Sequence, residues 1–241
     1  MRKNGLSQEG LKLVACVTML LDHIGASVIL ALYDQHPSQF LYDFYFLLRI
    51  IGRIAFPIFC FLLVEGVYYT KNPEKYAMRL MIGAILAEIP YDLLIFGEIT
   101  WKQSSVMVTL LLAFVWARLA IRTNKVIWKI ILLAIFACAA DLMQSDYQGY
   151  GVVMVAVFFF TRELPKRQLW QIAGVAAVCW IIGGLTIGTG LIQIPVQMFA
   201  IFALIPIFAY CGEKRTNNQW VQRFFYLFYP VHLLVLYLMV M

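Results

Sequence analysis

The sequence predicts an all-α polytopic membrane protein, a bundle of about nine transmembrane helices in a single transmembrane domain over residues 1–241. Hydrophobic residues make up 63% of the chain and charged residues only 13%, whereas soluble domains carry about 25% charged residues. The apolar residues fall into nine successive runs, and the basic residues collect in alternate connections between them. This composition excludes a soluble globular domain and a disordered chain.

The nine apolar runs are the predicted helices, since a helix needs about 20 residues to cross the hydrocarbon core of a bilayer. The first run is too long for a signal peptide and lacks a cleavage site, so we expect it to be retained as a span. The sixth run is short, and glycines between positions 183 and 190 blur the seventh and eighth. In chain order the runs cover about 11–32, 45–67, 77–97, 104–120, 126–143, 149–161, 168–187, 190–210 and 224–241.

The distribution of basic residues predicts a cytoplasmic N-terminus and an outside C-terminus, because cytoplasmic loops are enriched in Lys and Arg. The outer segments instead hold several acidic residues and a single lysine, Lys102. With this orientation the inner segments collect Arg2, Lys3, Lys12, Lys71, Lys75, Arg79, Arg118, Arg122, Lys125, Lys129, Arg162, Lys166, Arg167, Lys214, Arg215 and Arg223. The net charge of +6 therefore reflects membrane topology, and we expect no nucleic-acid partner.

Ionisable residues inside the apolar runs are the strongest sign of function, because a charge near the bilayer centre costs about 2.5–3.5 kcal/mol on insertion scales. Four predicted helices bring such a group to a similar depth, so we expect these groups to face one another around a polar cavity. They are Asp22 and His23, Arg49 and Arg53, Glu88 and Asp92, and His232; Glu65 lies nearer the inner end of its helix.

Spacing and prolines sharpen this prediction. Arg49 and Arg53 are four residues apart and share one face of a helix, as do Glu88 and Asp92. Prolines at 57, 90 and 230 lie close to these groups, and a proline removes a helical hydrogen bond that lipid cannot replace. The alternative is that the charges form Arg–carboxylate pairs that only fix helix packing.

Several stretches resemble the TraX family, which is linked to acetylation of conjugative pilin. The resemblance extends over most of the chain and is carried by LKLVACVTMLLDHIGASV (11–28), RIIGRIAFPIFCFLLVEGVYYTKN (49–72), the run ending RLMIGAILAEIP (79–90), DYQGYG (146–151) and FFYLFYPVHLL (224–234). The resemblance places the chain within a wider group of transmembrane acyltransferases that includes the acyltransferase-3 proteins. It implies a multi-pass enzyme of the bacterial cytoplasmic (inner) membrane.

The activity that the resemblance implies is transfer of an acetyl or other acyl group from cytosolic acyl-CoA. The acceptor amine or hydroxyl, on pilin, a glycan or a lipid, would be reached from the extracytoplasmic side. Acetyl-CoA is then a co-substrate, and no metal is expected, since the cysteines form no CxxC pair.

The chemistry of acyl transfer assigns roles to the buried residues. A base must take a proton from the acceptor, and His23 is suited to this near neutral pH. Arg53 is the candidate donor to the developing oxyanion. Asp22 points about 100° away from His23 around the helix, so Glu88 or another helix is expected to orient the imidazole.

The remaining site residues complete the expected cavity. Lys12 and Arg79 lie nearest its inner mouth and are expected to attract the phosphates of CoA. The expected substrate or cavity residues are Asp22, Arg49, Glu65, Asp92, Asp146 of the outer turn, and His232.

Two other functions stay open. A secondary, proton-coupled transporter also places charges at the midplane beside broken helices, although nine runs do not divide into two inverted halves. A haem or quinone protein could use His23 and His232 as axial ligands.

Overall fold

The computed structural model describes residues 5–187, 193–213 and 219–241. The basic residues Arg2, Lys3, Lys214 and Arg215, and the start of the eighth apolar run, lie outside these ranges. The chain divides into two compact units: unit 1 comprises Met1–Phe59 and Val175–Met241, and unit 2 comprises Cys60–Gly174. The single domain over residues 1–241 stays a prediction.

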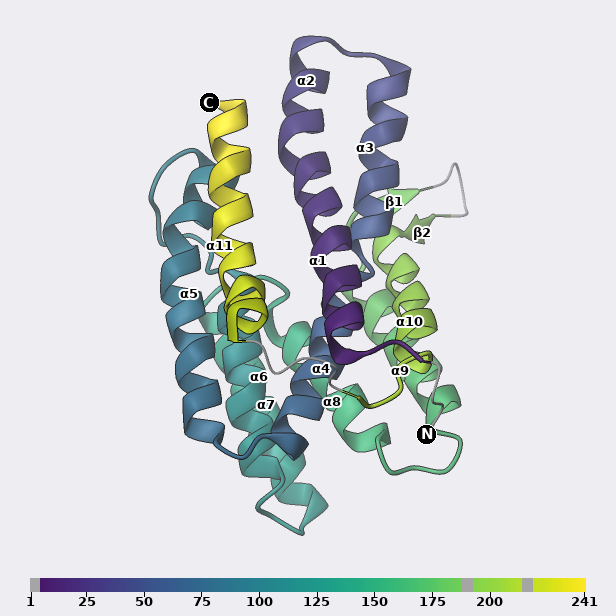
Figure 1. Ribbon diagram of the computed structural model, residues 1–241. Helices are drawn as coiled ribbons and strands as arrows, with labels where there is room; N and C mark the ends of the chain where they lie inside the picture. Colours follow the sequence, from purple (N-terminus) through teal and green to yellow (C-terminus); the bar gives the residue numbers. More distant parts are fainter. Residues whose placement is uncertain (1–4, 188–192, 214–218) are drawn as a thin grey trace. The chain divides into compact units, whose positions relative to one another are not determined.

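The first predicted span of unit 1 is one helical rod made of three segments. α1 (Gln8–Ile24) passes into a π-helical turn, η1 (Gly25–Ile29), and then into α2 (Leu30–Gln35). Figure 1 shows this rod beside α3. The side chain of Ser7 caps the start of α1 by accepting a hydrogen bond from the backbone N–H of Gly10.

The second predicted span, over 45–67, is helical with a break near Pro57, where the sequence predicts a kink. α3 (Gln39–Gly52) ends at Arg53 and Ile54, and α4 (Ala55–Tyr69) follows. The N–H groups of Arg53 and Ile54 bond to carbonyls three residues back, so the helix tightens there. Pro57 has no N–H to bond the carbonyl of Arg53, which favours a break at this point.

The seventh and eighth runs differ from the prediction. α9 (Arg167–Ile182) ends where Gly183 and Gly184 adopt positive φ angles of 61° and 84°. Two antiparallel strands of two residues each, β1 (Thr186–Ile187) and β2 (Ile194–Pro195), follow.

The described part of run 190–210 is mostly not α-helical. It contains a 3₁₀-helix, η2 (Val196–Ala203), and only a short α10 (Leu204–Phe208). Pro206 cannot donate to the carbonyl of Phe202, which interrupts an α-helical ladder. α11 (Gln219–Val240) contains the last predicted span, and its described residues pack on α1.

Unit 2 is built around α6. This helix (Val106–Ala120) packs against α5 (Pro73–Phe96), α7 (Val126–Leu142) and α8 (Gln148–Thr161). Asn72 caps the start of α5, and Gly97 follows its end with a φ of 72°, which a residue with a side chain rarely adopts. Trp116 of α6 is fully buried, and its Nε1 donates to the carbonyl of Lys129 at 3.2 Å.

The described chain has the apolar helices of a membrane protein. Among the described residues, three helical stretches are long and apolar enough to cross a membrane: Gln8–Gln35, Gln39–Tyr69 and Arg223–Val240. Shorter apolar helices cover Val106–Ala120, Gln148–Thr161, Arg167–Ile182 and Val196–Phe208.

We predict that Trp116→Phe destabilises the protein by about 1–3 kcal/mol, because it removes a buried hydrogen bond and leaves space in the centre of unit 2. Thermal unfolding in detergent measures the effect. Trp128→Phe is the matched control, since the Trp128 side chain is 52% exposed. Equal melting temperatures for the two variants would contradict the prediction.

Candidate functional site

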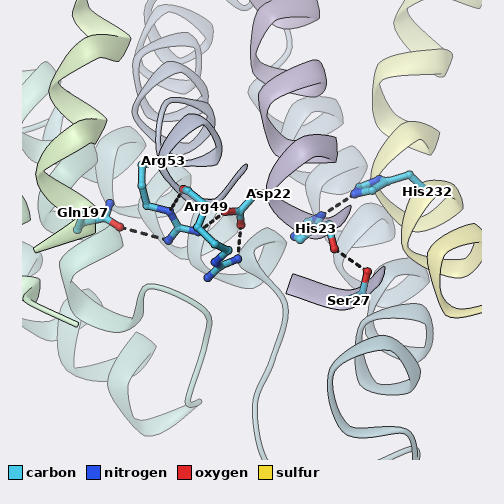
Figure 2. Close-up of polar contacts among 7 residues, drawn as sticks. All are labelled: Asp22, His23, Ser27, Arg49, Arg53, Gln197 and His232. Carbon is cyan, nitrogen blue, oxygen red and sulfur yellow. Dashed lines mark hydrogen bonds and ion pairs between the residues drawn. The ribbon is translucent and has the colours of Figure 1, made fainter. Parts of the chain in front are cut away.

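Two polar clusters in unit 1 start from neighbouring residues of α1. Figure 2 shows Asp22 directed toward two arginines and His23 directed toward His232. The adjacent positions lie about 100° apart around the helix, so one turn of α1 serves both clusters. The sequence predicted this divergence, and the structure shows the partner that each side chain meets.

The first cluster, here called the arginine cluster, consists of Asp22, Arg49, Arg53 and Gln197. Asp22 accepts hydrogen bonds from Nη1 of Arg49 at 2.8 Å and from Nη2 of Arg53 at 2.5 Å. Nη1 of Arg53 donates to Oε1 of Gln197 at 3.3 Å. Two guanidinium groups therefore share one carboxylate, and the cluster keeps a net positive charge.

The break between α3 and α4 places Arg53 in this cluster. The backbone N–H of Arg53 bonds to Ile50 instead of Arg49, which leaves the carbonyl of Arg49 without its usual helical donor. Nε of Arg53 donates to that carbonyl at 3.2 Å. The guanidinium of Arg53 thus supplies a hydrogen bond to a free carbonyl at the end of α3 while it also binds Asp22.

Close approach of α1 and α3 depends on two glycines. A Cβ added to Gly52 would lie 2.2 Å from Cβ and Oδ1 of Asp22. A Cβ at Gly25 would lie 3.0 Å from Cβ of Leu48. The absence of a side chain at these positions lets the carboxylate of Asp22 reach the arginines, and small residues commonly have this role between membrane helices.

The second cluster, here called the histidine pair, consists of His23 and His232. Nδ1 of His23 and Nε2 of His232 share a hydrogen bond of 2.7 Å. Nδ1 of His232 lies 2.6 Å from the carbonyl oxygen of Phe228, one turn earlier in α11. The side chain of His232 is buried, whereas His23 is half-buried.

The π-helical turn begins two residues after His23. The hydroxyl of Ser27 donates to the carbonyl of His23 at 2.6 Å. A π turn leaves helical carbonyls without their usual partners and is frequently found at functional sites, and here Ser27 supplies the partner by bonding back to the preceding turn.

Glu65 forms an ion pair in unit 2. It accepts from Nε of Arg162 at 3.3 Å, and Nη2 of Arg162 donates to the hydroxyl of Tyr69 at 3.0 Å. The guanidinium also lies 4.2 Å from the ring centroid of Tyr68. This arrangement agrees with the alternative that some of these charges form Arg–carboxylate pairs.

The other predicted carboxylates bind local donors of unit 2. Glu88 accepts from the backbone N–H of Ser105 at 3.1 Å and from its hydroxyl at 2.9 Å. Asp92 accepts from the N–H of Thr100 at 2.9 Å. In unit 1 the imidazole of His23 contacts His232 of α11, and the role predicted for Glu88 stays a prediction.

The outer turn contains Asp146, whose carboxylate accepts from the N–H of Tyr147 at 3.0 Å. Its backbone carbonyl accepts a hydrogen bond from the hydroxyl of Thr109.

The predicted CoA-binding residues face aromatic rings: Nζ of Lys12 lies 5.5 Å from the ring centroid of Phe225, and the Arg79 guanidinium lies 5.6 Å from that of Tyr76. Their proposed roles stay predictions.

A groove of about 570 Å³ opens along α3. It is lined by α3 residues between Tyr42 and Ile50, including Phe46, and by both residues of β1. The residues of the arginine cluster are not among those that line this groove. Within the described ranges, no three His, Cys, Asp or Glu side chains are grouped as a metal site requires.

Sequence reasoning missed Gln197, Ser27 and Gly52. Gln197 was visible as one of two glutamines, with Gln193, in the apolar run 190–210, and it is buried. Gly52 lies next to Arg53 in the sequence, but its closeness to Asp22 depends on the packing of two helices. Ser27 carried no signal, since serine is tolerated in membrane helices by bonding to its own backbone.

We predict that Gly52→Ala lowers stability by about 1–3 kcal/mol, because the new methyl group must displace the backbone of α1 or the Asp22 carboxylate. The measurement is thermal unfolding of the purified protein in detergent. Gly83→Ala is the matched control: its methyl group would meet only the flexible end of Met107. Equal destabilisation by both changes would contradict the role given to Gly52.

Comparison with known proteins places the chain in a family. The model of the TraX protein family matches residues 7–240. The probable fimbrial assembly protein FimC, serogroup H1, of Dichelobacter nodosus is 28% identical over 247 residues, which cover 94% of this chain and 92% of that protein. No solved structure matches the chain. Because the family model covers nearly the whole sequence, the chain belongs to the TraX family.

Proposed function

We propose that this protein is a membrane acyltransferase that moves an acetyl or other acyl group from cytosolic acyl-CoA to an acceptor amine or hydroxyl. The observation that carries the proposal is the arrangement at Asp22 and His23. These neighbours place an imidazole and a cluster of net positive charge on the same turn of α1.

The proton transfer is assigned to His23. As the acceptor nitrogen or oxygen attacks the thioester carbonyl, its N–H or O–H bond breaks and an N–H bond forms on the imidazole. A positioned base of this kind contributes about 10²–10⁴-fold to a rate. The half-buried position of His23 supports this role, because an acceptor must reach the ring.

The arginine cluster is assigned to the negative charge that develops on the carbonyl oxygen. Asp22 balances one of the two guanidinium charges, so the cluster retains attraction for an anion. The contacts of Arg53 with Asp22, Gln197 and the carbonyl of Arg49 hold the guanidinium in place before reaction. Such preorganisation is the main source of electrostatic stabilisation in enzymes.

Collapse of the intermediate completes the transfer. The bond between the carbonyl carbon and sulfur breaks, the CoA thiolate leaves, and it takes up the proton held by His23. Lys12 and Arg79 are proposed to attract the CoA phosphates from the cytoplasmic side. No metal enters these steps.

The acceptor is proposed to belong to a pilus. The family and the D. nodosus relative, named as a fimbrial assembly protein, support a role in pilus-related processes. Pilin is therefore the first acceptor to test, ahead of a glycan or lipid.

The proposed setting is the bacterial inner membrane, crossed nine times with the N-terminus in the cytoplasm. Its support is the alternation of basic and acidic connections along the sequence. This topology places the cytosolic donor and the external acceptor on opposite sides of one protein.

We predict that the purified protein in lipid vesicles transfers acetyl groups from radiolabelled acetyl-CoA to pilin. His23→Ala is expected to reduce the initial rate about 10²–10⁴-fold, because it removes the base. His36→Ala is the matched control, since His36 is exposed beyond the end of α2.

Two outcomes would contradict this assignment. Full transfer activity of the His23→Ala protein would show that another group is the base. Solute uptake that follows an imposed pH gradient, without any use of acetyl-CoA, would favour the transporter instead.

We predict that alkaline phosphatase fused after Met241 is active in cells, because the enzyme folds only outside the cytoplasm and the C-terminus is assigned there. A fusion after Asn124, in the connection between α6 and α7, is the control and is expected to be inactive. Activity in the reverse pattern would overturn the proposed orientation.

A further inference from the structure

We infer that His23, His232 and the carbonyl of Phe228 form a hydrogen-bond chain with a fixed direction. In this chain His232 is a positioning residue, and Nε2 of His23 is the basic nitrogen presented to the acceptor. The catalytic meaning of the chain rests on the proposed acyl transfer, whereas its direction rests on geometry alone.

The direction is set at the carbonyl of Phe228. A carbonyl oxygen can only accept a hydrogen bond, and Nδ1 of His232 lies 2.6 Å from it. Nδ1 of His232 therefore carries a hydrogen and donates it. In a neutral imidazole only one nitrogen is protonated, so Nε2 of His232 has a lone pair.

The second bond follows from the first. Nε2 of His232 lies 2.7 Å from Nδ1 of His23 and must accept, so Nδ1 of His23 donates. The remaining nitrogen of a neutral His23, Nε2, then carries the lone pair. Among the residues that the structure describes, this nitrogen has no hydrogen-bond partner.

The ring geometry suits such a chain. The planes of the two imidazoles differ by only 19°, and their centroids are 5.0 Å apart while the bonded nitrogens are 2.7 Å apart. The rings thus meet edge to edge in nearly one plane. In that arrangement the N–H of one ring points along the lone pair of the other, as a strong hydrogen bond requires.

The opposite direction is unfavourable. If His232 donated through Nε2, a neutral ring would turn its Nδ1 lone pair toward the lone pairs of the Phe228 oxygen at 2.6 Å. A doubly protonated His232 would place a further positive charge in a buried position, which is costly without a counter-ion. Both alternatives, a neutral His232 protonated at Nε2 and a doubly protonated His232, are therefore less favourable than the Nδ1–H tautomer.

Packing holds His232 in this orientation. The residue is 6% exposed, and its ring centroid lies 4.8 Å from that of Phe228 and 5.7 Å from that of Tyr229. A flip of the ring would replace both bonded nitrogens by carbon atoms. The buried His232 of α11 therefore fixes the tautomer of a half-buried residue on α1.

The hydrogen-bond chain also defines the path of the proton during acyl transfer. His23 gains the acceptor proton at Nε2, and its Nδ1–H bond to His232 then becomes charge-assisted and stronger. The Phe228 carbonyl cannot take up a proton, so the charge stays on the histidine pair. The proton returns from Nε2 of His23 to the departing thiolate.

The test is nitrogen NMR of the full-length protein in detergent with ¹⁵N-labelled histidine. The protein has three histidines. Protonated and unprotonated ring nitrogens give signals in separate regions of the ¹⁵N spectrum. We expect His23 and His232 both to be protonated at Nδ1 and unprotonated at Nε2. The exposed His36 is the internal control and should show averaged tautomers; a protonated Nε2 on neutral His23 would overturn the inference.

Two variants separate positioning from folding. His232→Gln can place its amide oxygen near the former Nε2 and accept from His23, whereas His232→Phe keeps the ring volume without an acceptor. We expect His23 to keep its Nδ1–H tautomer in the Gln variant and to lose it in the Phe variant. An unchanged His23 tautomer in the Phe variant would overturn the role of His232.

Acetyl transfer to pilin gives the second readout. The Phe variant is expected to lose about a hundredfold in rate, the lower limit for loss of a general base, and the Gln variant to recover most of it. If the wild-type protein shows the predicted tautomers but transfers no acetyl group, the proposed function alone is contradicted. Transfer by the wild type with the wrong tautomers would contradict the hydrogen-bond chain alone.

Discussion

The cost of burying charge among apolar helices is the constraint on which the arrangement of unit 1 depends. Asp22, Arg49 and Arg53 would each be unfavourable alone in an apolar environment, and they lower this cost by binding one another. The break after Gly52 and the lack of a side chain at that position bring the three groups together. The break that follows α3 and the glycine at position 52 therefore allow these charges to be buried together.

Neighbouring residues of α1 separate two kinds of chemistry. Asp22 belongs to a charged cluster whose donors exceed its acceptors, and His23 belongs to a hydrogen-bonded pair of imidazoles. Acyl transfer needs these two properties close together, since a proton leaves the acceptor as negative charge forms on the carbonyl oxygen. In unit 2, by contrast, Glu65 and Glu88 bind local partners that account for their burial.

Membership of the TraX family and the likeness to a fimbrial assembly protein support the proposed role in a membrane where pili are built. The proposed reaction adds a chemical task to this setting. It explains why a half-buried histidine is held by a buried one and why two arginines share a single carboxylate. A purely structural role would require neutralisation of charge but not the surplus positive charge of the arginine cluster.

The sequence by itself determined the helical membrane character, the presence of ionisable groups within apolar runs, the shared face of Arg49 and Arg53, and the divergence of Asp22 and His23. These properties depend on composition and on residue spacing along one helix, which are local. The partners were decided by tertiary structure. His23 and His232 are 209 positions apart, and residue depth within a helix does not specify which neighbouring helix a side chain faces. The approach of Gly52 to Asp22, the contact of Gln197 with Arg53 and the 3₁₀ geometry of η2 likewise arise only when separate segments pack together.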